Sequence, residues 1–293
     1  MNGLGNPVLG SMVRGHLLLA LGAAAQVRWL GEHWFFAPSW SRPVAAFLAV
    51  LACYGWMRRL RSRDEGGYNA PFLAWYRVHP RAAAWLAAGA AAGSCLALGD
   101  AWLDVIVRLL PVVLPAALYI TPWRSRSGAR IGLRGIPFLK SLLVAWVWAA
   151  GTVLLAHPGT DRADGLGPLL IAVFFGFYLA IAIAFDLRDL PFDPPALRTL
   201  PQVLGPMGAR ALALLALAPL AVMLLVALTV SSLPSEPGGP AAVDWSFALP
   251  WLVLPGLAVL IARSSPGRAV WHWLMLDASI VLLPLLAWAG SLL

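Results

Sequence analysis

Charged side chains are scarce in this chain: Asp, Glu, Lys and Arg make up 12% of its 293 residues, about half the share found in a typical soluble domain. Hydrophobic residues make up 60%. At roughly 20 apolar residues per crossing, this length leaves room for about eight to ten transmembrane helices. The composition therefore predicts an all-α polytopic membrane protein and excludes a separate water-soluble catalytic domain.

Cysteine and histidine are rare as well. The two cysteines, Cys53 and Cys95, lie in apolar segments, so we expect small core residues and no disulfide framework or cysteine-ligated zinc. The five histidines share no metal-ligand spacing. The sequence contains no P-loop, no dinucleotide fingerprint and no Ser/His/Asp arrangement, which excludes the corresponding classes of enzyme.

The formal net charge of +8 does not indicate a nucleic-acid partner. The arginines are scattered over short loops between apolar runs and do not form one basic face. Membrane proteins place such residues in cytoplasmic loops, so we expect membrane lipid and no nucleic acid around this chain.

Apolar runs separated by charged, proline and glycine residues predict nine helices around an apolar cavity. We expect one integral-membrane domain over 1–293, with pseudo-repeated halves at about 1–135 and 136–293. The predicted helices cover 13–30, 43–58, 82–99, 102–120, 138–156, 167–186, 208–232, 246–262 and 269–291.

Lysines and arginines predict the orientation of the bundle. The loops opposite the basic ones hold only Arg28, Arg42 and Arg162 together with most of the acids. The positive-inside rule therefore predicts a cytoplasmic N-terminus and an outer C-terminus, in a cell inner membrane. The loops after the second, fourth, sixth and eighth helices hold sixteen of the 21 cations: Arg58, Arg59, Arg61, Arg63, Arg77, Arg81, Arg124, Arg126, Arg130, Arg134, Lys140, Arg188, Arg198, Arg210, Arg263 and Arg268.

Three aspartates gather at the cytoplasmic end of the sixth predicted helix. Asp186, Asp189 and Asp193 are spaced by three and four residues, which places them on one face if the helix continues. Anions repel one another there and lie at the wrong end of the helix dipole, so they require a cation. Carboxylates at a membrane edge suit Mg²⁺. A solvated acidic loop that marks the helix end is the alternative.

The segment that begins at these aspartates resembles the second aspartate-rich motif of the UbiA superfamily of intramembrane prenyltransferases. Asp186-Leu-Arg-Asp-Leu-Pro-Phe-Asp193 is a D-x-x-D-x-x-x-D run, and Leu197-Arg-Thr-Leu-Pro-Gln-Val-Leu-Gly205 follows it as the basic-Thr-Leu-Pro segment. Gly135-Ile-Pro-Phe-Leu-Lys140 also resembles the start of the family's fifth helix. These motifs lie within residues 119 to 205, and the nine-helix topology extends the resemblance to most of the chain.

The resemblance implies Mg²⁺ as cofactor and transfer of a prenyl group from a prenyl diphosphate to an aromatic or other lipophilic acceptor. Asp186 and Asp189 would be catalytic, and both would bind the metal together with Asp193. Arg198, Lys140, Arg134 and Tyr119 fall where the family contacts the diphosphate. The chemistry needs cations for the leaving group and a dry, aromatic pocket for the allylic cation.

The first aspartate-rich motif of the family is degenerate in this chain. In the family's register its metal ligands would be Met57 and Arg61, and neither binds Mg²⁺. Asp64 and Glu65 remain one turn later. Three explanations stay open: these acids act as ligands after a local shift, Arg58, Arg61 and Arg63 contact the diphosphate in place of a metal, or the reaction has been lost. In the last case the protein would be a non-catalytic relative that binds a lipid or quinone or scaffolds a membrane complex.

One carboxylate, Asp277, falls inside the last predicted helix. An acid within the membrane is a functional candidate because its isolation in hydrocarbon is costly. The simpler explanation is a helix-packing hydrogen bond with Ser279 or Arg108.

Overall fold

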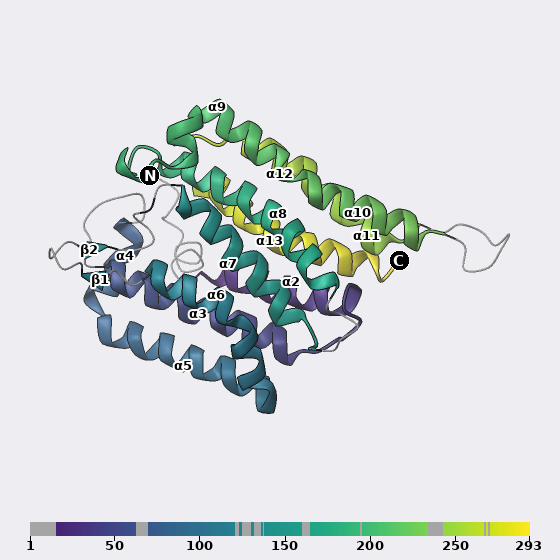
Figure 1. The fold of residues 1–293 in the computed structure, drawn as a ribbon, viewed down its shortest axis with the longest axis horizontal. Coiled ribbons are helices and arrows are strands. Elements are labelled where there is room, and N and C mark those ends of the chain that lie inside the picture. Colours follow the sequence, from purple (N-terminus) through teal and green to yellow (C-terminus); the bar gives the residue numbers. More distant parts are fainter. Residues whose placement is uncertain are drawn as a thin grey trace.

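The computed structural model is a bundle of helices that run along one long axis (Figure 1). It describes residues 16–62, 70–120, 123–124, 130–131, 136, 138–159, 165–193, 195–233, 243–266, 268 and 270–293. The helices within these ranges are α2 (Leu17–His33), α3 (Ser41–Arg61), α4 (Ala70–Val78), α5 (Pro80–Leu98), α6 (Trp102–Ile120), α7 (Leu139–Ala156), α8 (Leu166–Asp189), α9 (Leu200–Leu215), α10 (Ala218–Ser231), α11 (Trp245–Ala248), α12 (Val253–Ala262) and α13 (Val270–Gly290).

Short elements complete the described chain. Strands β1 (Trp123–Arg124) and β2 (Arg130–Ile131) pair antiparallel. The 3-10 turns are η1 (Gly99–Ala101), η4 (Pro195–Leu197) and η5 (Leu249–Leu252). Each of the nine predicted helices corresponds to a helical segment in the described ranges, so the all-α prediction and the helix count are confirmed. The short helix α4 was not predicted.

The segment predicted as one helix over 208–232 starts earlier and is divided. α9 begins at Leu200, where Thr199 and Gln202 form a capping box. Proline is tolerated in the first turn of a helix, so Pro201 does not block this start. Gly205, with φ of 69°, kinks the helix before Pro206. The predicted start at 208 was therefore wrong, because Pro201 and Pro206, which interrupt the apolar run, both lie within the helix.

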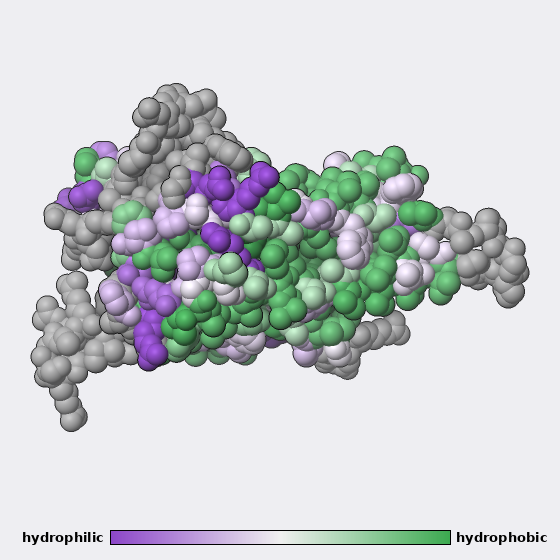
Figure 2. Space-filling view, turned by 90° about the horizontal axis from the view of Figure 1, so that it is seen from above, coloured by the Kyte–Doolittle hydropathy of each residue, from purple (hydrophilic) through white to green (hydrophobic). Residues whose placement is uncertain are grey.

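The exterior of the bundle is apolar. Large apolar side chains are exposed along the helices; Trp85, Leu96 and Leu215, for example, are 78%, 81% and 68% exposed. Figure 2 shows this apolar surface over the middle of the molecule, with hydrophilic residues gathered toward one end. A soluble monomer does not expose so much apolar area. Six helical segments in the described ranges are also long and apolar enough to cross a membrane, and the protein is an integral membrane protein.

Helix α8 lies at the centre of the bundle and packs against α7, α9 and α10. Phe174 and Phe177 on α8 are completely buried. Gly176 allows close approach, because a Cβ atom there would collide with the Ala216 carbonyl oxygen. Cys53, by contrast, is exposed on α3, and Cys95 is half-buried. The expectation of a core position for Cys53 was wrong because an apolar run does not show which side of a membrane helix is buried.

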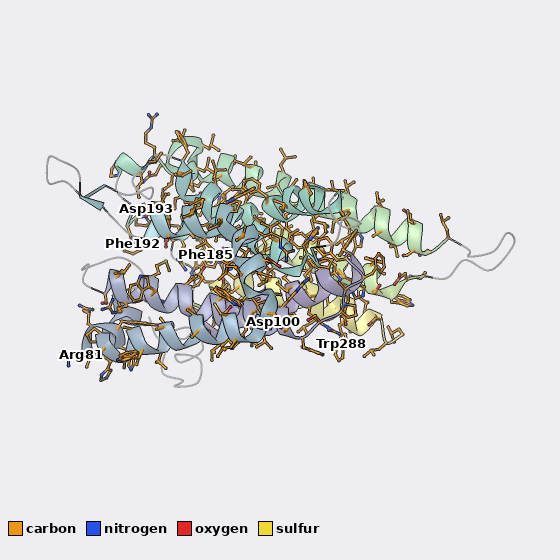
Figure 3. The ribbon with its side chains drawn as sticks, turned by 60° about the horizontal axis from the view of Figure 1, so that its bottom comes forward. Arg81, Asp100, Phe185, Phe192, Asp193 and Trp288 are labelled. Carbon is orange, nitrogen blue, oxygen red and sulfur yellow. The ribbon has the colours of Figure 1, made fainter. Side chains whose placement is uncertain are left out.

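Several loops predicted to share one side of the membrane do share one end of the bundle. Arg59 donates to the Pro80 carbonyl across the α3–α5 connection, and Arg210 donates to the Ser264 carbonyl at the α12–α13 connection. Figure 3 shows Arg81 and Asp193 at this end, with Asp100 and Trp288 farther toward the other. We call it the basic end.

Candidate functional site

The three aspartates lie together at the basic end of α8. Asp186 and Asp189 belong to the last turn of the helix, which ends at Asp189. The prediction of a single helical face required the helix to continue to Asp193, and it does not. The Asp193 amide nevertheless donates to the Asp189 carbonyl at 2.9 Å, so one further turn returns the Asp193 carboxylate to the other two.

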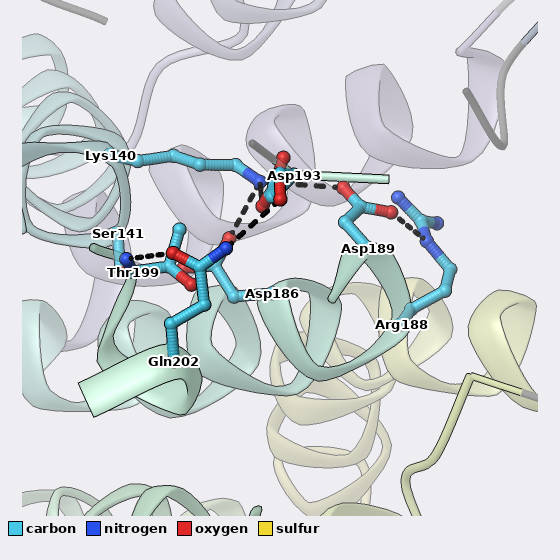
Figure 4. Close-up of polar contacts among 8 residues, drawn as sticks. All are labelled: Lys140, Ser141, Asp186, Arg188, Asp189, Asp193, Thr199 and Gln202. Carbon is cyan, nitrogen blue, oxygen red and sulfur yellow. Dashed lines mark hydrogen bonds and ion pairs between the residues drawn. The ribbon is translucent and has the colours of Figure 1, made fainter. Parts of the chain in front are cut away.

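The side chain of Lys140, from the first turn of α7, reaches the middle of this group (Figure 4). Its Nζ atom lies 3.0 Å from Asp186, 3.5 Å from Asp189 and 2.6 Å from Asp193. We call these four residues the acidic cluster. Like charges at this spacing repel one another, and the ammonium group is the cation that offsets the repulsion.

The charged side chains of the acidic cluster are largely buried, so each needs its oppositely charged partner. The side chains of Asp186, Asp193 and Lys140 are 3%, 7% and 14% exposed. Charges withdrawn from water are costly unless they are paired and hydrogen-bonded. The acidic cluster is therefore a compact, mutually compensated group and not the solvated loop of the alternative interpretation.

Each aspartate has a second contact that fixes its position (Figure 4). The Ser141 hydroxyl donates to the Asp186 carboxylate. Arg188 Nε donates to Asp189 at 2.8 Å. The Gln202 side chain donates to the Asp193 carbonyl at 3.0 Å while its own carbonyl accepts from the Thr199 amide. The carboxylates thus sit on a frame built by α7, α8 and the start of α9.

Aromatic rings continue inward from the cluster. Eight residues along each of the neighbouring helices α7 and α8, a rise of about 12 Å, lead from Lys140 to Trp148 and from Asp186 to Tyr178. The rings of Trp148 and Tyr178 are 5.4 Å apart, and Tyr54 from α3 lies 6.4 Å from Trp148. The interior of the bundle about two helical turns from the acidic cluster is therefore aromatic.

Arg188 links the cluster to further aromatic rings. Its guanidinium carbon lies 4.7 Å from the ring centre of Phe185 and 5.5 Å from that of Trp273 on α13. A guanidinium over a ring face gains cation–π attraction. Arg188 therefore offers a fixed positive charge next to the carboxylates.

The other predicted site residues are distributed more widely. Arg198 is exposed, with its guanidinium 5.8 Å from the Phe138 ring just before Lys140. Arg58 is buried in α3, at 7% exposure. Tyr119 is half-buried in the last turn of α6. Arg61 ends α3, and its side chain lies outside the described residues, as do Arg63, Asp64, Glu65 and Arg134 in full.

Asp277 lies half-buried in α13, but not with the expected partners. Ser279 donates to the Leu276 carbonyl, and Arg108 donates to the His157 carbonyl. The helix-packing explanation through these two residues was wrong, because each donates to a backbone carbonyl and not to Asp277. Asp277 lies one turn after Trp273, the ring that Arg188 contacts, and therefore on the same face of α13.

Ser141, Gln202 and the Arg188 contact were not singled out from the sequence. Thr199 and Gln202 do have the spacing of a capping box, which could have indicated a fixed turn after Asp193. Ser141 had no such signal, because its contact with Asp186 joins two helices across 45 residues.

The donor chemistry of the acidic cluster suits Mg²⁺, since carboxylate oxygens are its preferred protein ligands. In the arrangement present here the oxygens surround an ammonium group. Among the described residues, no group of three His, Cys, Asp or Glu side chains is arranged to hold a metal ion. Asp186, Asp189 and Asp193 thus have the side-chain chemistry of Mg²⁺ ligands, but in this arrangement their oxygens pair with the Lys140 ammonium.

The fold resembles that of a known membrane protein. The apo structure of a UbiA homolog from Aeropyrum pernix K1 matches with a TM-score of 0.61 and 17% sequence identity, over 94% of this chain and 97% of that one. No protein-family model and no curated protein matches the sequence. The resemblance to the UbiA superfamily is thus confirmed at the level of the fold.

Proposed function

We propose that this protein binds a prenyl diphosphate at the acidic cluster and transfers the prenyl group to a lipophilic, aromatic acceptor within the membrane. The arrangement of Asp186, Asp189 and Asp193 around one cation, at the end of an aromatic interior, is the observation that carries the proposal. The UbiA fold supports it, and the resemblance of the aspartate motif agrees with the position of the cluster.

The charges at the site suit an allylic diphosphate. Transfer breaks the bond between the allylic carbon and the diphosphate oxygen, and the electron pair leaves with the diphosphate. Lys140 and Arg188 supply positive charge at the cluster, and such charge stabilises a leaving anion. The prenyl chain would extend inward past Trp148 and Tyr178, whose ring faces stabilise an allylic cation and exclude water.

A new bond then forms between the allylic carbon and the acceptor, which loses a proton. Mg²⁺, when bound, would neutralise diphosphate charge, and Asp186, Asp189 and Asp193 are the residues that would hold it. On the positive-inside rule, the basic end and the site face the cytoplasm.

The degenerate first motif favours a second function. Because Met57 and Arg61 replace two carboxylate positions, the site has fewer acids than a two-motif enzyme. A non-catalytic protein that binds a lipid or quinone in the same interior would tolerate this loss.

A transfer assay distinguishes the two functions. The purified protein in lipid nanodiscs is incubated with radiolabelled farnesyl or geranylgeranyl diphosphate, MgCl₂ and a lipid extract, and labelled products are separated by chromatography. We expect labelled lipophilic product from the wild type and none from Asp186→Asn or Asp189→Asn. Asp100→Asn is the matched control, because this acid lies in η1, away from the basic end. Absence of product with retained lipid binding would favour the non-catalytic function.

A further inference from the structure

Lys140 differs from the aspartates around it in how it is held. Each aspartate has a second contact, to Ser141, Arg188 or Gln202. The Lys140 ammonium, by contrast, contacts only the three carboxylates among the described residues. A lysine has a flexible four-carbon stem, whereas an aspartate is short. Lys140 is therefore the member of the cluster that can move while the carboxylates stay in place.

The charge of the cluster changes with the position of Lys140. Three ionised carboxylates together with the cations of Lys140 and Arg188 give a net charge of −1. Withdrawal of the ammonium gives −2, which matches a divalent cation. Mg²⁺ dehydrates reluctantly and needs strong anionic ligands, so the ammonium group and the metal compete for the same oxygens.

A diphosphate would draw Lys140 away from the carboxylates. The residue lies in the first turn of α7, an 18-residue helix, where the helix dipole disfavours a cation and favours an anion. The Asp186 and Asp189 carboxylates end α8, where the dipole disfavours anions. An anionic ligand beside α7 and a metal beside α8 would relieve both conflicts at once.

We propose that Lys140 is a competing cation that keeps Mg²⁺ out of the acidic cluster until a diphosphate takes the ammonium group as its own ion-pair partner. Metal and diphosphate then bind together, and neither binds well alone. The inference rests on the proposed function, because it assigns the order of binding at that same site.

Mn²⁺ serves as a probe for the metal, because electron paramagnetic resonance counts the free ion directly. Affinity is measured for the full chain in nanodiscs, without and with farnesyl thiolodiphosphate, which does not react. For the wild type we expect weak Mn²⁺ binding alone and an affinity at least tenfold higher with the analogue. Lys140→Met should bind Mn²⁺ at least tenfold more tightly than the wild type without any diphosphate.

Two variants control for charge. Lys140→Arg keeps a cation and should resemble the wild type. Arg263→Met removes an exposed cation near the same end and should leave Mn²⁺ binding unchanged. Thermal unfolding checks that each variant is folded, and the wild-type comparison with and without the analogue needs no variant at all.

The possible outcomes distinguish failure of the proposed Lys140 role from failure of the proposed function. Equal Mn²⁺ affinity in the wild type with and without analogue, or no gain in folded Lys140→Met, overturns the role of Lys140. Binding of the analogue with Mn²⁺ in the same experiments keeps the proposed function. If neither the wild type nor Lys140→Met binds Mn²⁺ or the analogue under any condition, both proposals fail.

Discussion

The Lys140 ammonium and the Asp193 carboxylate lie 2.6 Å apart although 53 residues separate them in the chain. This contact joins the first turn of α7 to the turn that follows α8. Together with the Lys140 contacts to Asp186 and Asp189, it offsets the repulsion among the three acids.

Ser141 is expected to stabilise the folded protein through Asp186. Its hydroxyl donates to the carboxylate of Asp186, a buried residue, and hydrogen bonds to charged groups contribute about 1.5 to 3 kcal/mol. Ser141→Ala should therefore lower the free energy of unfolding by about that amount, measured by denaturant or thermal unfolding in detergent. Ser291→Ala is the control, because this exposed hydroxyl donates to the Trp288 carbonyl near the C-terminus. Equal effects of the two substitutions would contradict the assignment.

Gly176 is expected to be required for the packing of α8. A Cβ atom there would meet the Ala216 carbonyl, and overpacking typically costs about 1 to 3 kcal/mol. Gly176→Ala should lower the unfolding temperature, whereas Gly256→Ala in α12, which meets no atom within 4 Å, should keep or raise it. A lowered unfolding temperature for Gly256→Ala alone would show that the helix packing is wrong.

Contacts between helices, such as these, could not be predicted from the sequence, whereas features within one helix could. Apolar runs indicated every long helix, and the spacing of Asp186 and Asp189 indicated a shared face, because both signals are local. The position of Lys140 is set by how α7 packs on α8, and spacing within one helix carries no information on that. The capping box of Thr199 and Gln202 is also a local signal, and it indicates the start of α9 at Leu200.

The orientation of the bundle is open to a direct labelling test. With Cys53 and Cys95 replaced by alanine, a single cysteine is placed at Phe192 or at Asp100, both exposed and in different connections. The positive-inside rule predicts that position 192 faces the cytoplasm and position 100 the outside. An impermeant maleimide added to intact cells should label only position 100. The reverse pattern would invert the orientation, and labelling of both would contradict the helix count between them.

Arg58 is the described residue that can test whether cations replace the degenerate first motif. A charge-assisted contact to a phosphate is worth about 1.5 to 3 kcal/mol, so Arg58→Gln should weaken binding of farnesyl thiolodiphosphate about tenfold or more. Arg59→Gln is the neighbouring control, since Arg59 donates to the Pro80 carbonyl. Calorimetric titration gives both affinities. Affinity of Arg58→Gln within about twofold of the wild type would remove Arg58 from the site and leave Asp64 and Glu65 as the candidates.

Binding of farnesyl thiolodiphosphate with Mg²⁺ to the purified protein, followed by calorimetric titration, tests the central claim most directly. The account predicts saturable binding of one molecule to the wild type and to Asp100→Asn, and loss of binding in the folded double variant Asp186→Asn, Asp189→Asn. Unchanged affinity in that double variant would contradict the claim that the acidic cluster is the diphosphate site.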